Sequence, residues 1–218
     1  MSIKVNDLYD LTHTLAEDYL KGFEYPWQAL SGIKELIFKI GKGLGDDFEY
    51  PEEGVWIAKD AKIFKNANIY GPVIIGHATE VRPGVFIRGS ALVGNNCVVG
   101  NSTELKNVIL FDNVQVPHYN YVGDSILGYK AHMGAGSITS NVKSDKTLVV
   151  VKDGETHYET GLKKFGAMIG DNVEVGCNSV LNPGTVIGRN TNIYPLSSVR
   201  GVIPGNCIFK GAGSIVSK

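Results

Sequence analysis

The sequence has little that would point to a secreted, metal-binding or membrane-spanning protein. Its 218 residues include three cysteines, Cys97, Cys177 and Cys207, and no C-x-x-C pair. An odd number of widely spaced cysteines argues against a disulfide framework and a zinc site, and favours a reducing, cytoplasmic setting. No run of about 18 apolar residues occurs, and the N-terminus lacks a basic segment followed by an apolar stretch. We therefore predict neither a transmembrane helix nor a signal peptide.

A dominant charge of one sign is missing as well. The formal net charge is −1, from 21 lysines and arginines against 22 aspartates and glutamates. This balance gives no reason to expect nucleic acid or an anionic membrane as a partner, so we expect small molecules and further copies of the chain instead. With 43% hydrophobic residues the chain can bury a continuous core.

What the sequence does contain is an aliphatic residue at every sixth position over two long stretches. They are Ile57, Ile63, Ile69, Ile75, Val81, Ile87, Val93, Val99 and Leu105, and then Ile169, Val175, Leu181, Ile187, Ile193 and Val199. A helix of 3.6 residues per turn would scatter these positions, and a flat strand repeats every two residues. A six-residue unit, one short strand plus a corner, cannot bury its own apolar face. The pattern therefore predicts a β-solenoid with three faces per coil, in which position n lies over position n+18.

Two segments depart from the six-residue repeat. Residues 1–50 show helical spacing of their apolar residues, and we predict a helical segment that caps the open end of a 51–218 solenoid and protects its edge strand; docking of a partner is the alternative. The repeat loses its register between 107 and 138, and an insertion follows at 140–166. There, two strand-like runs flank Asp153 and Gly154, which predicts a β-hairpin. Irregular backbone on a rigid scaffold is where functional sites tend to lie.

Three polar side chains near the irregular region are candidates for chemistry. Arg88 and Lys106 share one outward position, one coil apart, so a single phosphate could bridge them across about 4.8 Å. Two solvated surface side chains are the alternative. Glu104, on the same strand as Lys106, is placed to orient it. His118 suits removal of a proton from an amine or hydroxyl nucleophile, although a lone histidine is more often structural.

The order of three short runs resembles a known family. The runs are Glu104-Leu105-Lys106, then His118-x-x-Tyr121-Val122-Gly123-Asp124, then Gly134-Ala135-Gly136-Ser137-Ile138-Thr139-Ser140-Asn141. They resemble the acetyltransferase domain of the bifunctional N-acetylglucosamine-1-phosphate uridylyltransferase/glucosamine-1-phosphate acetyltransferase. Archaeal sugar-1-phosphate nucleotidyltransferases with an acetyltransferase tail look closer still, since they share the proline before the histidine and a segment like 161–170. The resemblance covers about 81–199. It implies an all-β fold, the left-handed parallel β-helix of hexapeptide-repeat acyltransferases, and a homotrimer with its sites between subunits.

The resemblance also implies an activity: acetyl transfer from acetyl-CoA to the amine of a hexosamine 1-phosphate in UDP-N-acetylglucosamine synthesis, with no metal. In this interpretation His118 is the general base. The residues implied for the sugar phosphate are Arg88, Lys106, Tyr121, Asn141 and a later lysine, for which we choose Lys146. The residues implied beside acetyl-CoA are Gly134, Ala135 and Cys177, with a backbone N–H of Gly134 or Ala135 stabilising the oxyanion.

Three departures from the family pattern bear on the substrate. His132 occupies the place of an asparagine that contacts the sugar, which changes the shape of the pocket. Val142 follows Asn141 in place of a tyrosine. The glycine-rich nucleotide-binding signature of the uridylyltransferase half is absent from the sequence, which argues against nucleotidyl transfer.

Three other functions fit parts of the sequence. A γ-type carbonic anhydrase shares the solenoid, but its two zinc histidines are five residues apart, and here Gly123 stands five after His118; His77 and His132 do not restore the ligand set. A trimeric scaffold, acting as partner of a separate sugar nucleotidyltransferase, finds support in His132. An acetyltransferase acting on another amino sugar lies between the two, and the sequence does not choose the sugar.

Overall fold

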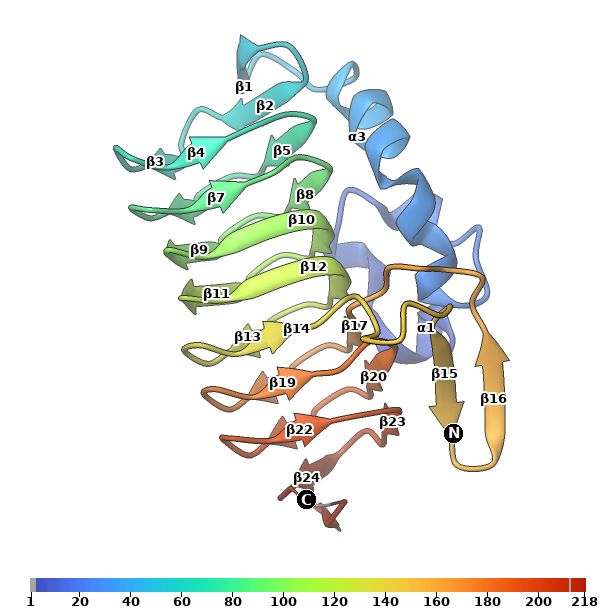
Figure 1. The fold of residues 1–218 in the computed structure, drawn as a ribbon. Helices are drawn as coiled ribbons and strands as arrows, with labels where there is room; N and C mark the ends of the chain where they lie inside the picture. Colours follow the sequence, from blue (N-terminus) through green and yellow to red (C-terminus); the bar gives the residue numbers. More distant parts are fainter. Residues whose placement is uncertain (1–2, 212) are drawn as a thin grey trace.

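The structure is a computed structural model that describes residues 3–211 and 213–218. Short parallel strands stack coil on coil into a β-solenoid with three faces (Figure 1), which confirms the predicted solenoid and fits a left-handed β-helix. Face 1 consists of β2 (Val55–Ala58), β5 (Val73–Ile75), β8 (Ala91–Val93), the second halves of β10 (Glu104–Leu110) and β12 (Tyr121–Leu127), β17 (Ala167–Ile169), β20 (Thr185–Ile187) and β23 (Val202–Ile203). Face 2 consists of β3 (Lys62–Ile63), β6 (Glu80–Val81), β9 (Val98–Asn101), β11 (Gln115–His118), β13 (His132–Met133), β18 (Glu174–Val175), β21 (Asn192–Ile193) and β24 (Cys207–Phe209). Face 3 consists of β4 (Asn68–Ile69), β7 (Phe86–Ile87), the first halves of β10 and β12, β14 (Ile138–Thr139), β19 (Val180–Leu181) and β22 (Ser198–Val199).

The six-residue aliphatic positions form the core of the solenoid. The three predicted ladders are present: Ile57–Ile75–Val93, Ile63–Val81–Val99 and Ile69–Ile87–Leu105. Their members from the second coil onwards are fully buried, whereas Ile63 in the first coil is 37% exposed. The core therefore tightens once each coil has a neighbour on both sides.

The loss of register in the middle of the chain comes from a shortened corner. Strand partners in the first coils are 18 positions apart, as in Val73 and Ala91, but Glu104 pairs with Tyr121, 17 positions on. These coils have one residue fewer between face 3 and face 1, so β10 and β12 run continuously around this corner. Asn107 and Asp124 turn it with φ values of 56° and 47°. Asn and Asp tolerate this left-handed conformation better than other side-chain-bearing residues.

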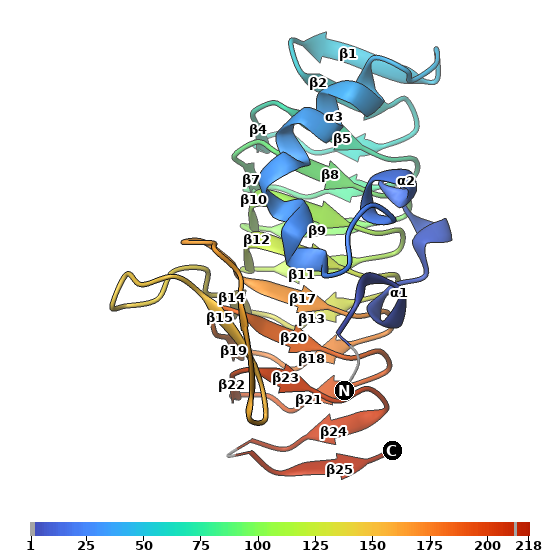
Figure 2. The ribbon, with the colours of Figure 1, turned by 90° about the vertical axis from the view of Figure 1, so that its right-hand side faces the viewer.

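The N-terminal helices do not cap the open end of the solenoid, and that expectation is wrong. They are α1 (Val5–Leu8), η1 (Leu11–His13), α2 (Glu17–Leu20), η2 (Pro26–Gly32) and α3 (Ile33–Gly41). Helix α3 lies along β5, β8 and β10 of face 1, and η2 contacts β12 (Figure 2). The reason is that the outward residues of face 1 are apolar, including Ile74, Leu92 and Ile109, which the helices bury almost completely. The boundary near residue 50 stays a prediction.

Antiparallel strands, in place of helices, close the two ends of the solenoid. β1 (Phe48–Glu52) pairs with β2 at one end, and β25 (Ile215–Ser217) pairs with β24 at the other. Each supplies partners to a strand edge that would otherwise be open to other chains. In the described residues no helix is long and apolar enough to cross a membrane.

The insertion forms the predicted hairpin and packs against the rest of the protein. Its strands are β15 (Val150–Asp153) and β16 (Thr156–Glu159), with Gly154 at φ 57° in the turn. β15 contacts β23, and the ring of Tyr158 lies 6.2 Å from that of Trp27 in η2. The hairpin thus continues the cover of face 1 that the N-terminal helices begin.

Candidate active site

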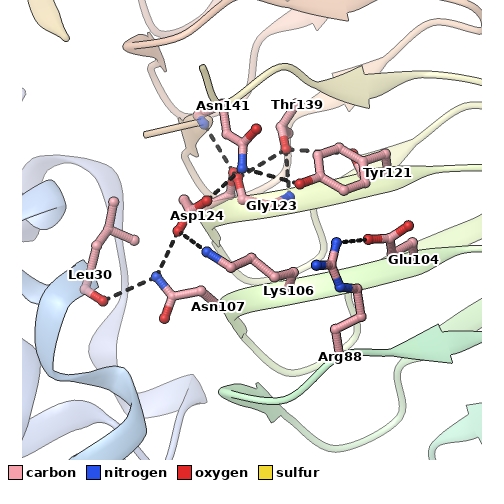
Figure 3. Close-up of polar contacts among 12 residues, drawn as sticks. Leu30, Arg88, Glu104, Lys106, Asn107, Tyr121, Gly123, Asp124, Thr139 and Asn141 are labelled. Atoms are coloured by element: carbon pink, nitrogen blue, oxygen red, sulfur yellow. Dashed lines mark hydrogen bonds and ion pairs between the residues drawn. The ribbon is translucent and has the colours of Figure 1, made fainter. Parts of the chain in front are cut away.

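Asp124 lies at the centre of a polar cluster at the short corner between face 3 and face 1 (Figure 3). Its side chain is 4% exposed, and its Oδ1 atom accepts hydrogen bonds from Lys106 Nζ at 2.8 Å and from Asn107 Nδ2 at 3.0 Å. Its Oδ2 atom accepts one from Asn141 Nδ2 at 2.5 Å. A buried carboxylate is tolerated only where donors and an opposite charge surround it. We call Lys106, Asn107, Asp124 and Asn141 the Asp124 cluster.

Two distant segments of the chain hold the Asp124 cluster in place. Asn107 Nδ2 also donates to the carbonyl oxygen of Leu30 in η2, at 3.2 Å. The N–H of Gly166, where the insertion returns to the solenoid, donates to the main-chain carbonyl of Asp124 at 2.8 Å. The position of Lys106 therefore depends on the N-terminal segment and on the insertion as well as on its own strand.

Tyr121 joins the Asp124 cluster through Asn141, whose Nδ2 atom donates to the Tyr121 hydroxyl at 3.1 Å. Burial raises the pKa of Tyr121 above its usual 10.0, and the negative charges of Asp124 and Glu104 raise it further. The phenol therefore stays protonated at neutral pH. Because its oxygen accepts from Asn141, its own O–H can donate to a ligand.

Arg88 and Lys106 are neighbours in one outward row, as the sequence predicts. The Arg88 N–H donates to the Leu105 carbonyl at 2.9 Å, which fixes the register. The expectation that Glu104 orients Lys106 is wrong. Glu104 accepts from Arg88 at 2.8 Å, whereas Lys106 is held by Asp124. Each cation therefore has its own carboxylate, and each still has further N–H donors for a ligand.

His118 ends β11 and is exposed at the corner between face 2 and face 3. Gln115 pairs with His132, and His132 pairs with Glu174 on the following coil. Each of these residues is three positions before a member of the next row, so His118, Ala135 and Cys177 are stacked in the same way. Cys177 is exposed too. This row and the Asp124 cluster flank face 3 on opposite sides, so the structure arranges these predicted residues around a single strand-wide surface.

Only one of the two amides implied for the oxyanion is free. The Gly134 N–H donates to the Val175 carbonyl at 2.7 Å, which removes it from that role. For the Ala135 N–H, the part of the chain that the structure describes offers no acceptor. Asn120 Nδ2 donates to the Gly134 carbonyl at 2.9 Å and holds this turn rigid beneath His118.

His132 and Lys146 lie outside both groups. His132 is on face 2, where its Nδ1 atom pairs with Glu174 at 2.7 Å. Lys146 is exposed on the insertion, and its side chain has no hydrogen bond or ion pair with the described residues. In a single chain, neither contacts the Asp124 cluster.

Sequence reasoning missed Asn107 and the role of Asp124. Asp124 stands at the end of the second motif quoted above, and Asn107 follows directly after Lys106. The available signal was the interruption of the six-residue spacing at 107, because an asparagine or aspartate at a lost register position is typical of a tight turn.

Comparisons with known proteins agree with the resemblance found in the sequence. Residues 69–164 match the GMPPB C-terminal domain family, and residues 166–201 match the bacterial transferase hexapeptide (six repeats) family. The chain is 37% identical to the bifunctional protein GlmU of Methanococcus aeolicus over 60% of this chain and 36% of that one. It is 30% identical to the bifunctional sugar-1-phosphate nucleotidylyltransferase/acetyltransferase of Sulfurisphaera tokodaii over 87% of this chain and 51% of that one.

The chain spans about half the length of these relatives or less. A solved structure of a hexapeptide transferase family protein from Anaplasma phagocytophilum has a TM-score of 0.42 and 17% identity, covering 75% of this chain and 80% of that one. The sequence matches and the stacked ladders together show that this chain is a hexapeptide-repeat protein, homologous over most of its length to the bifunctional sugar-1-phosphate nucleotidylyltransferase/acetyltransferases.

Proposed function

We propose that the protein is an acyltransferase that moves an acetyl group from acetyl-CoA to the amine of a hexosamine 1-phosphate. The observation that carries the proposal is the arrangement around face 3. Arg88 and Lys106 are adjacent on one side with Tyr121 and Asn141 beside them, and His118 stands across the same face. The names of the relatives, which include sugar-1-phosphate nucleotidylyltransferase/acetyltransferase, support the same chemistry.

In this proposal the sugar phosphate binds to Arg88 and Lys106. Each cation is already oriented by a carboxylate, Glu104 at 2.8 Å and Asp124 at 2.8 Å. An ammonium has three donors and a guanidinium five, so both can keep their carboxylate and still donate to phosphate oxygens. The Tyr121 hydroxyl donates to the sugar. Orientation before binding lowers the entropy lost when the ligand arrives.

His118 then acts as general base. It takes one proton from the substrate ammonium, and the free amine attacks the thioester carbonyl carbon. A C–N bond forms, and the oxyanion is stabilised by the Ala135 N–H. The C–S bond breaks, the coenzyme A thiolate takes the second proton of the nitrogen, and His118 releases its proton to solvent.

The openness of the site supports the homotrimer that the resemblance implies. Face 3 with His118 and Cys177 exposed at its edge forms one wall, and a second copy would supply the other. Light scattering at micromolar concentration is expected to give three times the monomer mass. A monomer would contradict a site shared between subunits.

The experiment that tests the function is turnover with acetyl-CoA and glucosamine 1-phosphate, comparing wild type with His118→Ala. Loss of the base is expected to lower kcat about 10²–10⁴-fold with an unchanged melting temperature, because His118 is exposed. His77→Gln, at a partly exposed histidine of a regular coil, serves as the matched control and is expected to keep full turnover. Full turnover by His118→Ala would remove this residue from the mechanism.

A second candidate is the non-catalytic scaffold. It is favoured by one observation, the pairing of His132 with Glu174, because an imidazole held by a carboxylate replaces the amide of the family asparagine at this position. Wild-type protein that binds glucosamine 1-phosphate without transferring acetyl to any amino sugar phosphate would make the scaffold the better account.

A further inference from the structure

A polar cavity of 610 Å³ lies between the hairpin and the coils that follow it. The insertion contributes Lys143 and Asp145, the hairpin contributes Lys152 and Glu159, and the solenoid contributes Asn182 and Arg200. Arg200 is in the same outward row as Lys106, four coils further on, since 106 pairs with 123 and the later strands continue the row through 140 and 182. At about 4.8 Å per coil the two positions are about 19 Å apart. Lys152 and Arg200 therefore lie at the end of the cavity far from Lys106, whereas Ser140 and Val142, at its other end, flank Asn141 of the Asp124 cluster.

The walls of the cavity are fixed to each other. Val149 and Val151 of the insertion are fully buried. A Cβ atom added to Gly201 would lie 2.7 Å from the Lys152 carbonyl oxygen and 3.8 Å from the Lys152 Cβ, so the hairpin backbone touches the coil. Arg200 directly precedes Gly201, so the side chains of Lys152 and Arg200 start from neighbouring backbone positions, one on each wall of the cavity.

The charges in the cavity differ from those of the Asp124 cluster. Lys143 is paired with Asp145 at 3.3 Å. Within residues 3–211 and 213–218, Lys152 and Arg200 have no carboxylate within 4.0 Å. Arg88 and Lys106 each have one. Two unpaired cations that line one concave surface attract an anion, because the low-dielectric walls concentrate their field.

The remaining lining favours a hydroxyl-bearing ligand. Asn182 Nδ2 donates to Ser198 Oγ at 3.1 Å and to the Val199 carbonyl at 2.9 Å, which leaves its Oδ1 atom as an acceptor. Glu159 offers further acceptor oxygens. The volume exceeds that of a single phosphate group, and a guanidinium matches phosphate oxygens in a bidentate manner. We propose that this cavity binds a phosphorylated, hydroxyl-bearing small molecule, with its phosphate on Lys152 and Arg200.

Calorimetric titration of the full chain with pyrophosphate, glucose 1-phosphate and uridine diphosphate tests the proposal. We expect wild type to bind at least one phosphate probe, and the double variant Lys152→Ala/Arg200→Ala to bind it about 10-fold or more weakly, because two charge-assisted contacts are lost. Both side chains are exposed, so the melting temperature should not change. Strongest binding of glucose 1-phosphate supports a sugar monophosphate, and strongest binding of uridine diphosphate supports a nucleoside diphosphate. Strongest binding of pyrophosphate would overturn the proposal that the ligand bears hydroxyl groups.

The matched control is Lys163→Ala/Lys164→Ala, which removes two exposed lysines of the same insertion outside the cavity and should leave binding unchanged. Lys106→Ala weakens the proposed sugar-phosphate site, but it should leave unchanged the part of probe binding that Lys152→Ala/Arg200→Ala removes, which keeps the two sites distinct. Equal binding by wild type and the Lys152/Arg200 variant overturns the proposal. So does loss of that same part of binding in Lys106→Ala, or no binding of any probe by wild type up to about 10 mM, the limit of a weak site.

Discussion

The regular coils near the start of the solenoid and the two coils in its middle differ by one residue at one corner. In the regular coil, Gly89 and Ser90 turn the corner between β7 and β8, with φ values of 90° and 52°. In the shortened coils, Asn107 or Asp124 alone makes the turn, and the strand continues around it. Because the shortened coils have one residue fewer, an asparagine or aspartate stands at the corner in place of the glycine-serine pair. Polar side chains meet there.

The surroundings of that corner decide what those side chains do. The carbonyl of Leu30 approaches from the N-terminal segment, and Asn141 approaches from the start of the insertion. At this corner Asp124 is 4% exposed, while its partner Lys106 remains 28% exposed. A buried carboxylate that holds a partly exposed cation is a fixed point from which a ligand can be bound, which the regular corners do not offer.

The largest expected effect comes from removing the central carboxylate. Asp124→Ala takes away the acceptor of three side-chain donors, and we expect the free energy of unfolding to fall by about 3 kcal/mol, within the range for breaking a buried pair. Thermal and urea unfolding measure it. The control is Asp60→Ala on a regular coil, where the exposed pair with His77 should contribute less than about 1 kcal/mol. Equal losses in the two variants would contradict the contrast between the corners.

Next in size is the loss of the cluster's cation. Lys106→Ala should raise KM for glucosamine 1-phosphate by about 10- to 100-fold, because one charge-assisted contact to the phosphate contributes about 1.5–3 kcal/mol. Initial rates at varied sugar concentration measure it. Arg82→Ala, which removes a cation paired with Glu80 on face 2, is the control and should leave KM unchanged. An equal loss with glucosamine lacking the phosphate would show that Lys106 does not bind that group.

A smaller effect is expected for the link to the N-terminal segment. Asn107→Ala removes the amide shared by Leu30 and Asp124 and places alanine at a positive φ. We expect about 1–2 kcal/mol of destabilisation by urea unfolding, together with a rise in KM for the sugar phosphate. Asn113→Ala, another asparagine with positive φ at 61°, controls for the backbone strain. If both variants raise KM equally, the hydrogen bonds of Asn107 to Leu30 and Asp124 do not help to position Lys106.

The smallest effect concerns thiol chemistry and leaves stability unchanged. Burial raises the pKa of the Cys97 thiol to about 12, so at pH 8 it is a neutral, covered thiol inside a regular coil. Cys177 is exposed in the row with His118. Iodoacetamide at pH 8 should modify Cys177 in the native protein and reach Cys97 only after unfolding, as mass spectrometry of tryptic peptides would show. Modification of Cys97 in the folded state would contradict the tight core.

The alkylation also tests the proposed position of acetyl-CoA. If Cys177 lines its path, then acetyl-CoA at saturating concentration should slow the alkylation of Cys177. Cys207 is buried and should stay unmodified in either state of ligation, which makes it the internal control. An unchanged rate at Cys177 would place the coenzyme away from this row.

The sequence by itself determined the periodic parts of this protein. Residues six apart, such as Ile75, Val81 and Ile87, lie on successive faces because each unit can bury its aliphatic side chain only by stacking. The same rule put Arg88 beside Lys106, and the Asp153-Gly154 pair located the hairpin. The tertiary structure alone decided contacts between units that share no period. Helix α3 lies along face 1 and not over its end, Glu104 holds Arg88 and not Lys106, and Leu30 reaches Asn107 across 77 positions. Periodicity specifies which residues stack. Which carboxylate pairs with a given cation depends on the geometry of the corner, and one residue fewer at that corner changes this geometry.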